Sequence, residues 1–450
     1  MFVIYNQRGA NCNRQLSMAN PSTAARSGAR TALVLLLAIN LFNYIDRQIL
    51  AAVLPHIKRD FLAGDPNQNS KAGLLTTAFL LSYMCAAPVF GWLADRFSRW
   101  MLVGISVALW SLASGWSGLA VSFFVLLCTR AFVGIGEAGY GPAAPTILSD
   151  LYPLERRGRV LAYFYLALPV GGALGYAFGG KMADLLGWRW AFYLVVPPGL
   201  LLAVFCFFMR DPRRQSGAAS GLRERAQLKD YFKLIRIPSY LINTAAMTAL
   251  TFAIGGFSAW LPDYIYSDRG GEFTPDPNLL GNINLTFGAI VAAAGLFGTL
   301  LGGWAGDWLR GRFRSSYFLV SGVGVLLAFP ATIAMLYVRF PGAWLCIFVA
   351  VFFLFFNTGP SNTALANVTM PSVRATAFAL NIFIIHALGD ALSPPLIGAI
   401  RDRWSMNAGF FAVSFSMLVA GILWFCGARF LARDTAAIES QTTAQPGPVL

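Results

Sequence analysis

Long apolar stretches separated by short polar segments follow one another along almost the whole chain. Each has about 20 residues or more, the length at which an α-helix crosses the hydrocarbon core of a bilayer. A helix satisfies every backbone polar group inside lipid without help from other segments. The pattern predicts twelve membrane-spanning helices, near residues 31–55, 72–94, 100–118, 122–149, 159–180, 188–209, 239–261, 282–306, 316–338, 342–369, 375–400 and 407–430.

A polar, basic segment divides these stretches into two sets of six. Residues 210–238 are rich in Lys, Arg, Gly, Ala and Ser, a composition typical of a tether with an amphipathic stretch on the membrane surface. We therefore expect a disordered cytoplasmic tail, an N-terminal six-helix bundle, a cytoplasmic linker, a C-terminal six-helix bundle and a second cytoplasmic tail. Their boundaries are 1–30, 31–210, 211–238, 239–432 and 433–450.

Three features recur at matching places in the two halves. A Gly-Trp sequence ending in Asp closes the second and eighth spans, Pro-x-x-Arg precedes the fifth and eleventh, and an Asp follows those two. The pairs are Gly91–Asp95 with Gly303–Asp307, Pro153 and Arg156 with Pro371 and Arg374, and Asp184 with Asp402. Such a repeat indicates an all-α membrane protein with twelve transmembrane helices in two six-helix pseudo-repeats, which resembles the major facilitator fold.

The composition agrees with a membrane protein and excludes a soluble one. Of the 450 residues 57% are hydrophobic and 12% charged, against roughly 25% charged in an ordinary soluble domain. The net charge of +14 does not indicate nucleic-acid binding, because the basic residues are spread over short loops. With both termini in the cytoplasm, 23 of the 34 Lys and Arg lie on the cytoplasmic side. This excess predicts that orientation, in the cell (inner) membrane.

Six ionisable residues lie inside the predicted spans. They are Asp46 and Arg47 on the first span, Arg130 and Glu137 on the fourth, and His386 and Asp390 on the eleventh. A charge at the centre of a bilayer costs at least ~2.5 kcal/mol, so such residues usually face a cavity and a partner. They could form a site, or only a network that holds helices together, and we place Asp390 in the structural group.

Other chemistry is not indicated. Gly134-x-Gly136-x-x-Gly139 matches a dinucleotide fingerprint but lies in an apolar helix without a preceding strand, so close helix packing explains it better. Gly171, Gly175 and Gly179 receive the same interpretation. The sequence has no metal-ligand spacing, no ATP-binding lysine motif and no nucleophile turn. We therefore expect no metal, no cofactor and no enzyme activity.

Five segments together resemble the Spinster family of the major facilitator superfamily, over residues 30–430. They are NYIDRQILAAVLPHIKRDF at 43–61, GWLADRFSRW at 91–100, RAFVGIGEAGYGPAAPTILSDLYP at 130–153, GWRWAF at 187–192 and HALGDALSPPLIG at 386–398. Compact loops and short tails point to a bacterial member. The resemblance implies proton-coupled secondary transport of amphipathic lipids such as lysophospholipids or sphingosine phosphate.

The resemblance also assigns roles to single residues. Asp46 and Arg47 match the acid–base pair of the first span, Arg130 and Glu137 that of the fourth, and His386 the histidine of the eleventh. The loop after the second span resembles the superfamily's gating loop; its residues are Asp95, Arg96 and Arg99, with Asp307 and Arg310 as a weaker second copy. An ordinary charged turn is the alternative for this loop.

We interpret the chain as a transporter that works by alternating access, as a monomer, with protons, membrane lipids and a lipid or small-molecule substrate as partners. Asp46 and Glu137 would couple protons, whereas Arg47, Arg130, Tyr83, Tyr165, Trp260 and His386 would bind substrate. Burial favours a neutral acid and a nearby arginine favours a charged one, so protonating either acid would release Arg47. The alternatives are a proton symporter for small organic anions such as sugar acids and, less favoured, a membrane-embedded lipid enzyme or receptor.

Overall fold

The protein is described here by a computed structural model, which describes residues 28–211, 234–370 and 373–444. Within these residues the chain is helical and forms no β-strand. Eleven of the helical segments are long and apolar enough to cross a membrane. The predicted fifth span is helical as well, but Lys181 and Asp184 near its end lower its apolar character.

The described residues of the N-terminal half form ten helices, because some membrane spans are broken into two helices. They are α1 (Ala29–Ala52), α2 (Leu54–Phe61), α3 (Gln68–Arg96), α4 (Arg99–Gly118), α5 (Phe123–Glu137), α6 (Tyr140–Leu151), α7 (Leu154–Tyr165), α8 (Ala167–Leu185), α9 (Trp188–Tyr193) and α10 (Val196–Phe208). The predicted fourth span is the pair α5 and α6, the fifth is α7 and α8, and the sixth is α9 and α10.

The C-terminal half repeats this plan. Its helices are α13 (Pro238–Ser267), η1 (Gly270–Glu272), α14 (Leu279–Arg310), α15 (Ser316–Tyr337), α16 (Gly342–Phe356), α17 (Thr358–Asn367), α18 (Arg374–Ile385), η2 (His386–Asp390), α19 (Ser393–Arg403) and α20 (Met406–Ala444). The tenth span breaks at Asn357, between α16 and α17, and the eleventh contains the π-helical turn η2. Such turns are frequent at functional sites.

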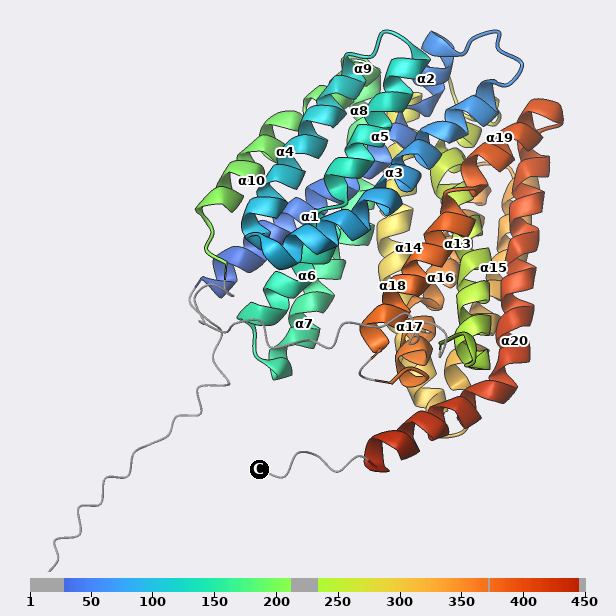
Figure 1. Cartoon of the computed structure of the whole chain (residues 1–450). Coiled ribbons are helices and arrows are strands. Elements are labelled where there is room, and N and C mark those ends of the chain that lie inside the picture. Colours follow the sequence, from blue (N-terminus) through green and yellow to red (C-terminus); the bar gives the residue numbers. More distant parts are fainter. Residues whose placement is uncertain (1–27, 212–233, 371–372, 445–450) are drawn as a thin grey trace, which may run out of the picture.

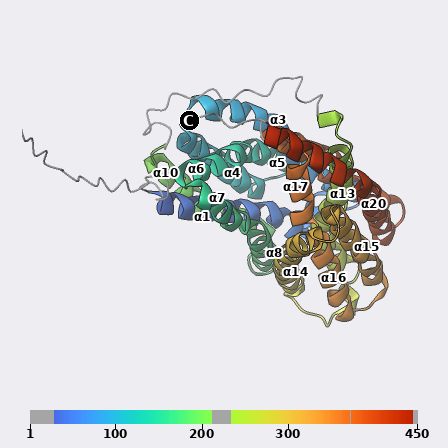
Figure 2. The ribbon, with the colours of Figure 1, turned by 90° about the horizontal axis from the view of Figure 1, so that it is seen from below.

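The two halves lie side by side and touch mainly through two helix pairs, with further contacts of α13 to α1 and α2. Helix α8 packs against α14, and α3 packs against α19. Helix α1 begins and α20 ends at the same end of the molecule, which we call the terminus end; α2 and α9 mark the far end (Figure 1). Figure 2 shows α8 beside α14 from the terminus end.

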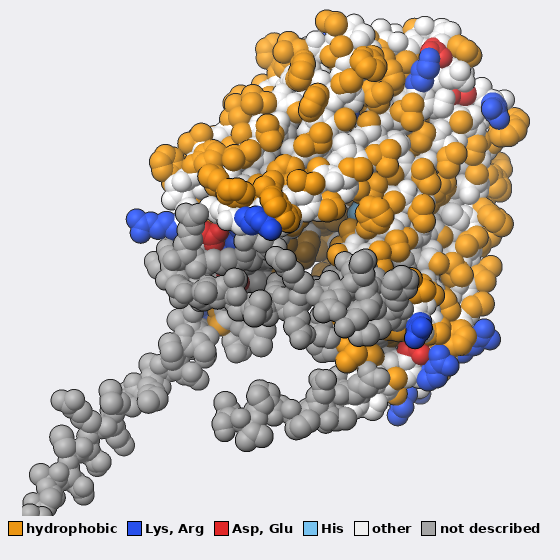
Figure 3. Space-filling view, in the orientation of Figure 1, with side chains coloured by type: hydrophobic (Ala, Val, Ile, Leu, Met, Phe, Trp, Pro, Cys, Tyr) orange, Lys and Arg blue, Asp and Glu red, His pale blue; other side chains and the backbone are white. Residues whose placement is uncertain are grey.

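The surface fits a membrane. Hydrophobic side chains cover the flanks of both halves, and charged side chains gather near the two ends (Figure 3). Figure 3 also shows a hollow between the halves toward the terminus end. The exposed apolar residues include Phe124, Phe208 and Leu345. A surface of this kind is expected where the solvent is lipid rather than water.

The glycines of the predicted packing motifs face neighbouring helices, as expected. A Cβ on Gly134 would lie 2.2 Å from the carbonyl oxygen of Phe79 on α3, and one on Gly136 would lie 2.6 Å from the backbone nitrogen of Trp110 on α4. A Cβ on Gly175 would lie 2.5 Å from the carbonyl oxygen of Ile45 on α1. These contacts bring α3 and α4 against α5, and α8 against α1.

The boundary predicted at residue 432 can be compared with the structure. Most of the predicted linker and of the N-terminal tail lies outside the described residues. Helix α20 continues past residue 432 to Ala444, so the C-terminal tail begins as a helix. Its side chains reach the bundle, because the Asp434 carboxylate accepts a hydrogen bond from the backbone N–H of Ser239 at 3.0 Å.

Two adjacent glycines on α14 test this close packing. A Cβ on Gly302 would lie 1.8 Å from the carbonyl oxygen of Phe356, whereas one on Gly303 meets nothing within 4 Å. Gly302→Ala should therefore lower the free energy of unfolding by about 1–3 kcal/mol, with a lower melting temperature of the purified protein in detergent. Gly303→Ala is the matched control and should leave the melting temperature unchanged; equal shifts would contradict the packing.

Candidate functional site

Four charged residues of the N-terminal half form the charge cluster: Asp46 and Arg47 on α1, and Arg130 and Glu137 on α5. The structure pairs residues of different helices. The Nε of Arg47 donates to Oε2 of Glu137 at 2.7 Å. Glu137 is the last residue of α5, directly before Ala138 and Gly139 interrupt the span. The ion pair therefore fastens the break in span four to α1.

Arg47 is the member of this pair that can be approached from outside. Its side chain is 24% exposed, whereas that of Glu137 is fully buried. Its guanidinium carbon lies 5.4, 5.1 and 5.3 Å from the ring centres of Tyr44, Phe79 and Tyr83. Contacts of this kind hold a cation by the negative faces of aromatic rings. Arg47 is thus a positioned cation with an aromatic surround.

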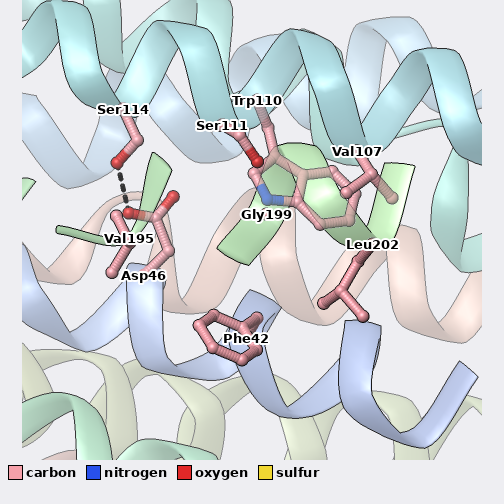
Figure 4. Close-up of a pocket in the computed structure, with 9 residues that line it drawn as sticks. All are labelled: Phe42, Asp46, Val107, Trp110, Ser111, Ser114, Val195, Gly199 and Leu202. Atoms are coloured by element: carbon pink, nitrogen blue, oxygen red, sulfur yellow. Dashed lines mark hydrogen bonds between the residues drawn. The ribbon is translucent and has the colours of Figure 1, made fainter. Parts of the chain in front are cut away.

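Asp46 points to a different neighbour. Because adjacent helical residues point about 100° apart, it turns toward α4, where the Ser114 hydroxyl donates to its Oδ1. The other carboxylate oxygen, Oδ2, is buried without a hydrogen-bond partner. Asp46 also lines a cavity of about 10 Å³ between α1, α4 and α10 (Figure 4). That volume is near the lower limit for one water molecule.

Arg130 is a buried cation with unused hydrogen-bond donors. Its side chain is 1% exposed, and its Nε and Nη1 have no hydrogen-bond partner. It interacts electrostatically with Asp46 and Glu137, and it is repelled by Arg47. The Phe79 ring lies 5.6 Å from its guanidinium carbon. Unpaired buried donors are costly, so an anionic acceptor placed here would be bound favourably.

The remaining predicted binding residues separate into two groups. Tyr83 contacts Arg47, and the exposed Tyr165 stacks edge-on against Phe164 near the same bundle. His386 lies on the other half, with Nδ1 at 2.9 Å from Oδ2 of Asp390. Trp260 is fully buried and donates its indole N–H to the carbonyl oxygen of Pro394 at 2.9 Å.

Trp260 therefore lies in the packed far end of the C-terminal half rather than along a cleft. Its ring faces the Nζ of Lys58 at 5.7 Å and the guanidinium of Arg401 at 5.9 Å. The sequence interpretation took its aromatic ring as a possible cleft lining, but the ring is fully buried and contacts residues of α2 and α19.

The predicted gating residues lie at the terminus end. Arg99 is buried and holds Asp150 and Asp211, each at 2.8 Å. Arg96 is exposed and stacks on Trp92, with 3.8 Å between the guanidinium carbon and the ring centre. The Asp95 side chain lies outside what the structure describes.

The second copy of the loop is built differently. The Tyr317 hydroxyl donates to Oδ1 of Asp307 at 2.8 Å, and Nη1 of Arg310 donates to that hydroxyl at 3.3 Å. Arg310 also forms an ion pair with Glu439 of α20 at 3.4 Å. Here a tyrosine joins the acid and the base, whereas Arg96 of the first copy stacks on Trp92.

A charge network at the far end was not recognised in the sequence. The buried Asp263 carboxylate accepts hydrogen bonds from Lys58 at 2.7 Å and from Arg401. Lys58 comes from the N-terminal half and the other two residues from the C-terminal half. Asp263 next to the seventh span was the available signal, but the predicted span ended two residues earlier. The network joins the halves at the far end, opposite the hollow.

Two helical bundles with internal charges, joined at one end and parted at the other, define a membrane transporter of the major facilitator type. The sequence model of the Major Facilitator Superfamily matches residues 36–394. Protein spinster of Drosophila melanogaster is 36% identical over 85% of this chain, which spans 63% of that protein. The sphingosine-1-phosphate transporter SPNS2 of Xenopus tropicalis is 34% identical over 89% of this chain and 82% of its own length.

A solved structure agrees in fold. It is a bacterial homologue of the human lysosomal transporter Spinster in an inward-facing, unoccupied conformation, with a TM-score of 0.75 and 22% identity over 95% of this chain and 100% of that one. The chain belongs to the Spinster family of the Major Facilitator Superfamily.

The pairing of Arg47 with Glu137 can be tested by two double-mutant cycles. Combining Arg47→Gln with Glu137→Gln should show a coupling energy of about 1–3 kcal/mol, because the partners are in direct contact. Combining Arg47→Gln with Asp46→Asn should give a smaller value, since Asp46 is bound by Ser114. Chemical unfolding in detergent measures both cycles; a larger coupling with Asp46 would show that the pairing is wrong.

Proposed function

We propose that this protein moves an amphipathic anionic lipid, such as a lysophospholipid or a sphingosine-phosphate-like molecule, by proton-coupled alternating access. The observation that carries the proposal is Arg47, a partly exposed cation among three aromatic rings whose ion-pair partner, Glu137, is fully buried. An anionic headgroup that reaches Arg47 competes with Glu137 for it. Cargo binding and the charge of Glu137 are then linked.

The lipid character of the cargo rests on the surroundings of the cation. Tyr44, Phe79 and Tyr83 offer apolar surface directly beside Arg47, and a hollow lies between the halves toward the terminus end (Figure 3). The relative named as a sphingosine-1-phosphate transporter carries a lipid phosphate. A phosphate headgroup is a strong acceptor for a guanidinium, and Arg130 supplies further unused donors.

The orientation that we propose places the terminus end in the cytoplasm and the chain in the cell (inner) membrane. It is supported by the excess of Lys and Arg in the segments at that end. In this orientation the hollow faces the cytoplasm and the far end is closed toward the outside. The conformation then corresponds to the inward-facing state of an alternating-access cycle.

Coupling follows from the cost of an unpaired buried charge. When a headgroup takes Arg47, Glu137 is left as a buried carboxylate without its cation, so it takes up a proton. When the cargo leaves, Arg47 returns and the proton is released. Asp46, with one unpaired oxygen beside a cavity, is a second acid that responds to whether Arg130 is engaged. A proton bound in one conformation and not the other shifts their populations.

Neutral variants of the two acids test coupling. Glu137→Gln and Asp46→Asn should abolish substrate-driven proton uptake in vesicles, because each mimics a permanently protonated acid. Glu137→Gln should still bind cargo, since it frees Arg47, whereas Arg47→Ala should not. Glu272→Gln, at an acid of the far-end loop before α14 bonded to Arg269 at 2.9 Å, serves as the control. Proton uptake at the wild-type rate in both neutral variants would refute coupling through this cluster.

The cargo class is tested by uptake into protein-containing vesicles under an imposed pH gradient. A lysophospholipid and sphingosine 1-phosphate should be taken up and should compete with each other, and gluconate, a sugar acid, should do neither. Strong uptake of gluconate without lipid uptake would favour the small-anion symporter and would refute the lipid proposal.

The orientation is tested by two single-cysteine variants in a background without other cysteines. Val121, in the far-end loop after α4, is 84% exposed, and Arg312, in the terminus-end loop after α14, is exposed. In intact cells a membrane-impermeant maleimide should label Val121→Cys and not Arg312→Cys. Arg312→Cys should react after permeabilisation. The reverse pattern would invert the proposed orientation.

A further inference from the structure

Two helices at the far end, one in each half, are preceded by the same three residues. Asp-Pro-Asn at 65–67 precedes α3, and Asp-Pro-Asn at 276–278 precedes α14. In both copies the Asp carboxylate accepts a hydrogen bond from the backbone N–H of the Asn, at 2.9 Å in the first and 2.8 Å in the second. The duplicated sequence thus builds the same turn twice.

Neither asparagine caps the helix that it introduces. Asn is among the best residues at the N-cap, the position directly before the first helical residue. Its side-chain oxygen can accept a hydrogen bond there from a free N–H of the first turn. Asn67 and Asn278 both occupy that position, and neither side chain makes such a bond. The acceptors come instead from the opposite half of the molecule.

Helix α3 receives its acceptor from α19. The Asp402 carboxylate accepts hydrogen bonds from the backbone N–H groups of Asn69 at 3.0 Å and Ser70 at 2.8 Å. It also accepts from the side-chain amide of Asn69 and the hydroxyl of Ser70, each at 2.8 Å. Four charge-assisted bonds therefore join the two halves at this point.

Helix α14 receives its acceptor from α8. The Asp184 carboxylate accepts a hydrogen bond from the backbone N–H of Gly281 at 2.6 Å. Asp184 and Asp402 are the aspartates that recur after the fifth and eleventh spans. The two contacts are thus pseudo-symmetric, and each joins a helix of one half to an aspartate of the other. Asp184 accepts one hydrogen bond, and Asp402 accepts four.

Glycine permits both approaches. A Cβ on Gly398 of α19 would lie 2.3 Å from the carbonyl oxygen of Asn69, and one on Gly281 would lie 2.6 Å from Oδ2 of Asp184. No ordinary side chain fits at these distances. The first turns of α3 and α14 therefore lie directly against the aspartates that serve them.

We propose that Asp402 caps α3 and Asp184 caps α14 while the far end is closed, and that these caps act as a latch that holds the halves together there. When the far end opens, Asn67 and Asn278 replace them as the caps of the same two helices. Separating the halves removes an acceptor from each helix start, where the free N–H groups and the helix dipole favour a negative group. The idle asparagine of each turn then supplies the cap within its own half. Opening exchanges one cap for another, and Asp402 is the stronger latch. This inference rests on the alternating-access part of the proposed function.

The experiment measures the far-end distance between spin labels on Val121→Cys and Tyr337→Cys, in a background without other cysteines. Both residues are highly exposed and lie at the far end, one in each half. Asp402→Ala should raise the ratio of separated to closed molecules by at least about tenfold, and Asp184→Ala by about two- to fivefold. Asp402→Asn is a second variant should the alanine variant not fold, with a shift in the same direction.

Two further variants distinguish a specific loss of the far-end caps from a general loss of stability at the helix starts. Asp276→Ala removes an acid just before α14 whose hydrogen bonds, to Asn278 and Asn282, stay within the C-terminal half, and it should not increase the separated population. Asn67→Ala should lower the separated population, alone and in the Asp402→Ala background, because it removes the cap of the open state.

The proposal is overturned if Asp402→Ala leaves the distances unchanged, if Asp276→Ala shifts them equally, or if Asn67→Ala raises the separated population. The distances are measured without cargo and without a pH gradient. Failure of the lipid or proton proposals therefore leaves this result unaffected, and a failed latch leaves those proposals standing.

Discussion

A charge in the hydrocarbon core of a bilayer needs a partner, and the ion pair of Arg47 with Glu137 meets this need between α1 and α5. Glu137 stands where span four breaks, so the pair holds the broken helix in place. Only the arginine of this pair is partly exposed, whereas the glutamate is fully buried. In the proposed mechanism a ligand acts on the acid by way of its cation, so that binding and protonation form one linked equilibrium.

The duplicated architecture carries unequal chemistry. Spans four and ten both break near their middle, but Glu137 precedes the first break and Asn357, an amide, marks the second. The C-terminal half has its own pair, His386 with Asp390, at a π-helical turn. The charge cluster thus belongs to the N-terminal half, while the C-terminal half carries a partly exposed histidine–aspartate pair in its eleventh span. The repeat accounts for the shared helix plan, and the differences between its two copies account for the charge cluster.

Much of this could be predicted from the sequence, because span length, loop charge and buried glycine depend on local composition. The helical spans, the repeat and the choice of intramembrane charges follow from it. The pairing does not. Asp46 and Arg47 are neighbours in sequence, yet they point to different helices, and only the tertiary packing of α4 and α5 gives Asp46 to Ser114 and Arg47 to Glu137. Trp260 was misplaced for a related reason, since its neighbours Lys58 and Pro394 come from other helices, which an apolar pattern does not reveal.

The linker between the halves has firm attachment points. Asp211, directly before residues 212–233, is held by Arg99, and Leu234, directly after them, is fully buried in the hydrophobic core. A chain of that length reaches roughly 75 Å when fully extended, several times the diameter of a helix. This length sets only an upper limit on the distance between the two anchors, so the halves can separate without releasing either of them. The contacts between the bundles, above all α8 with α14 and α3 with α19, then carry the cost of that separation.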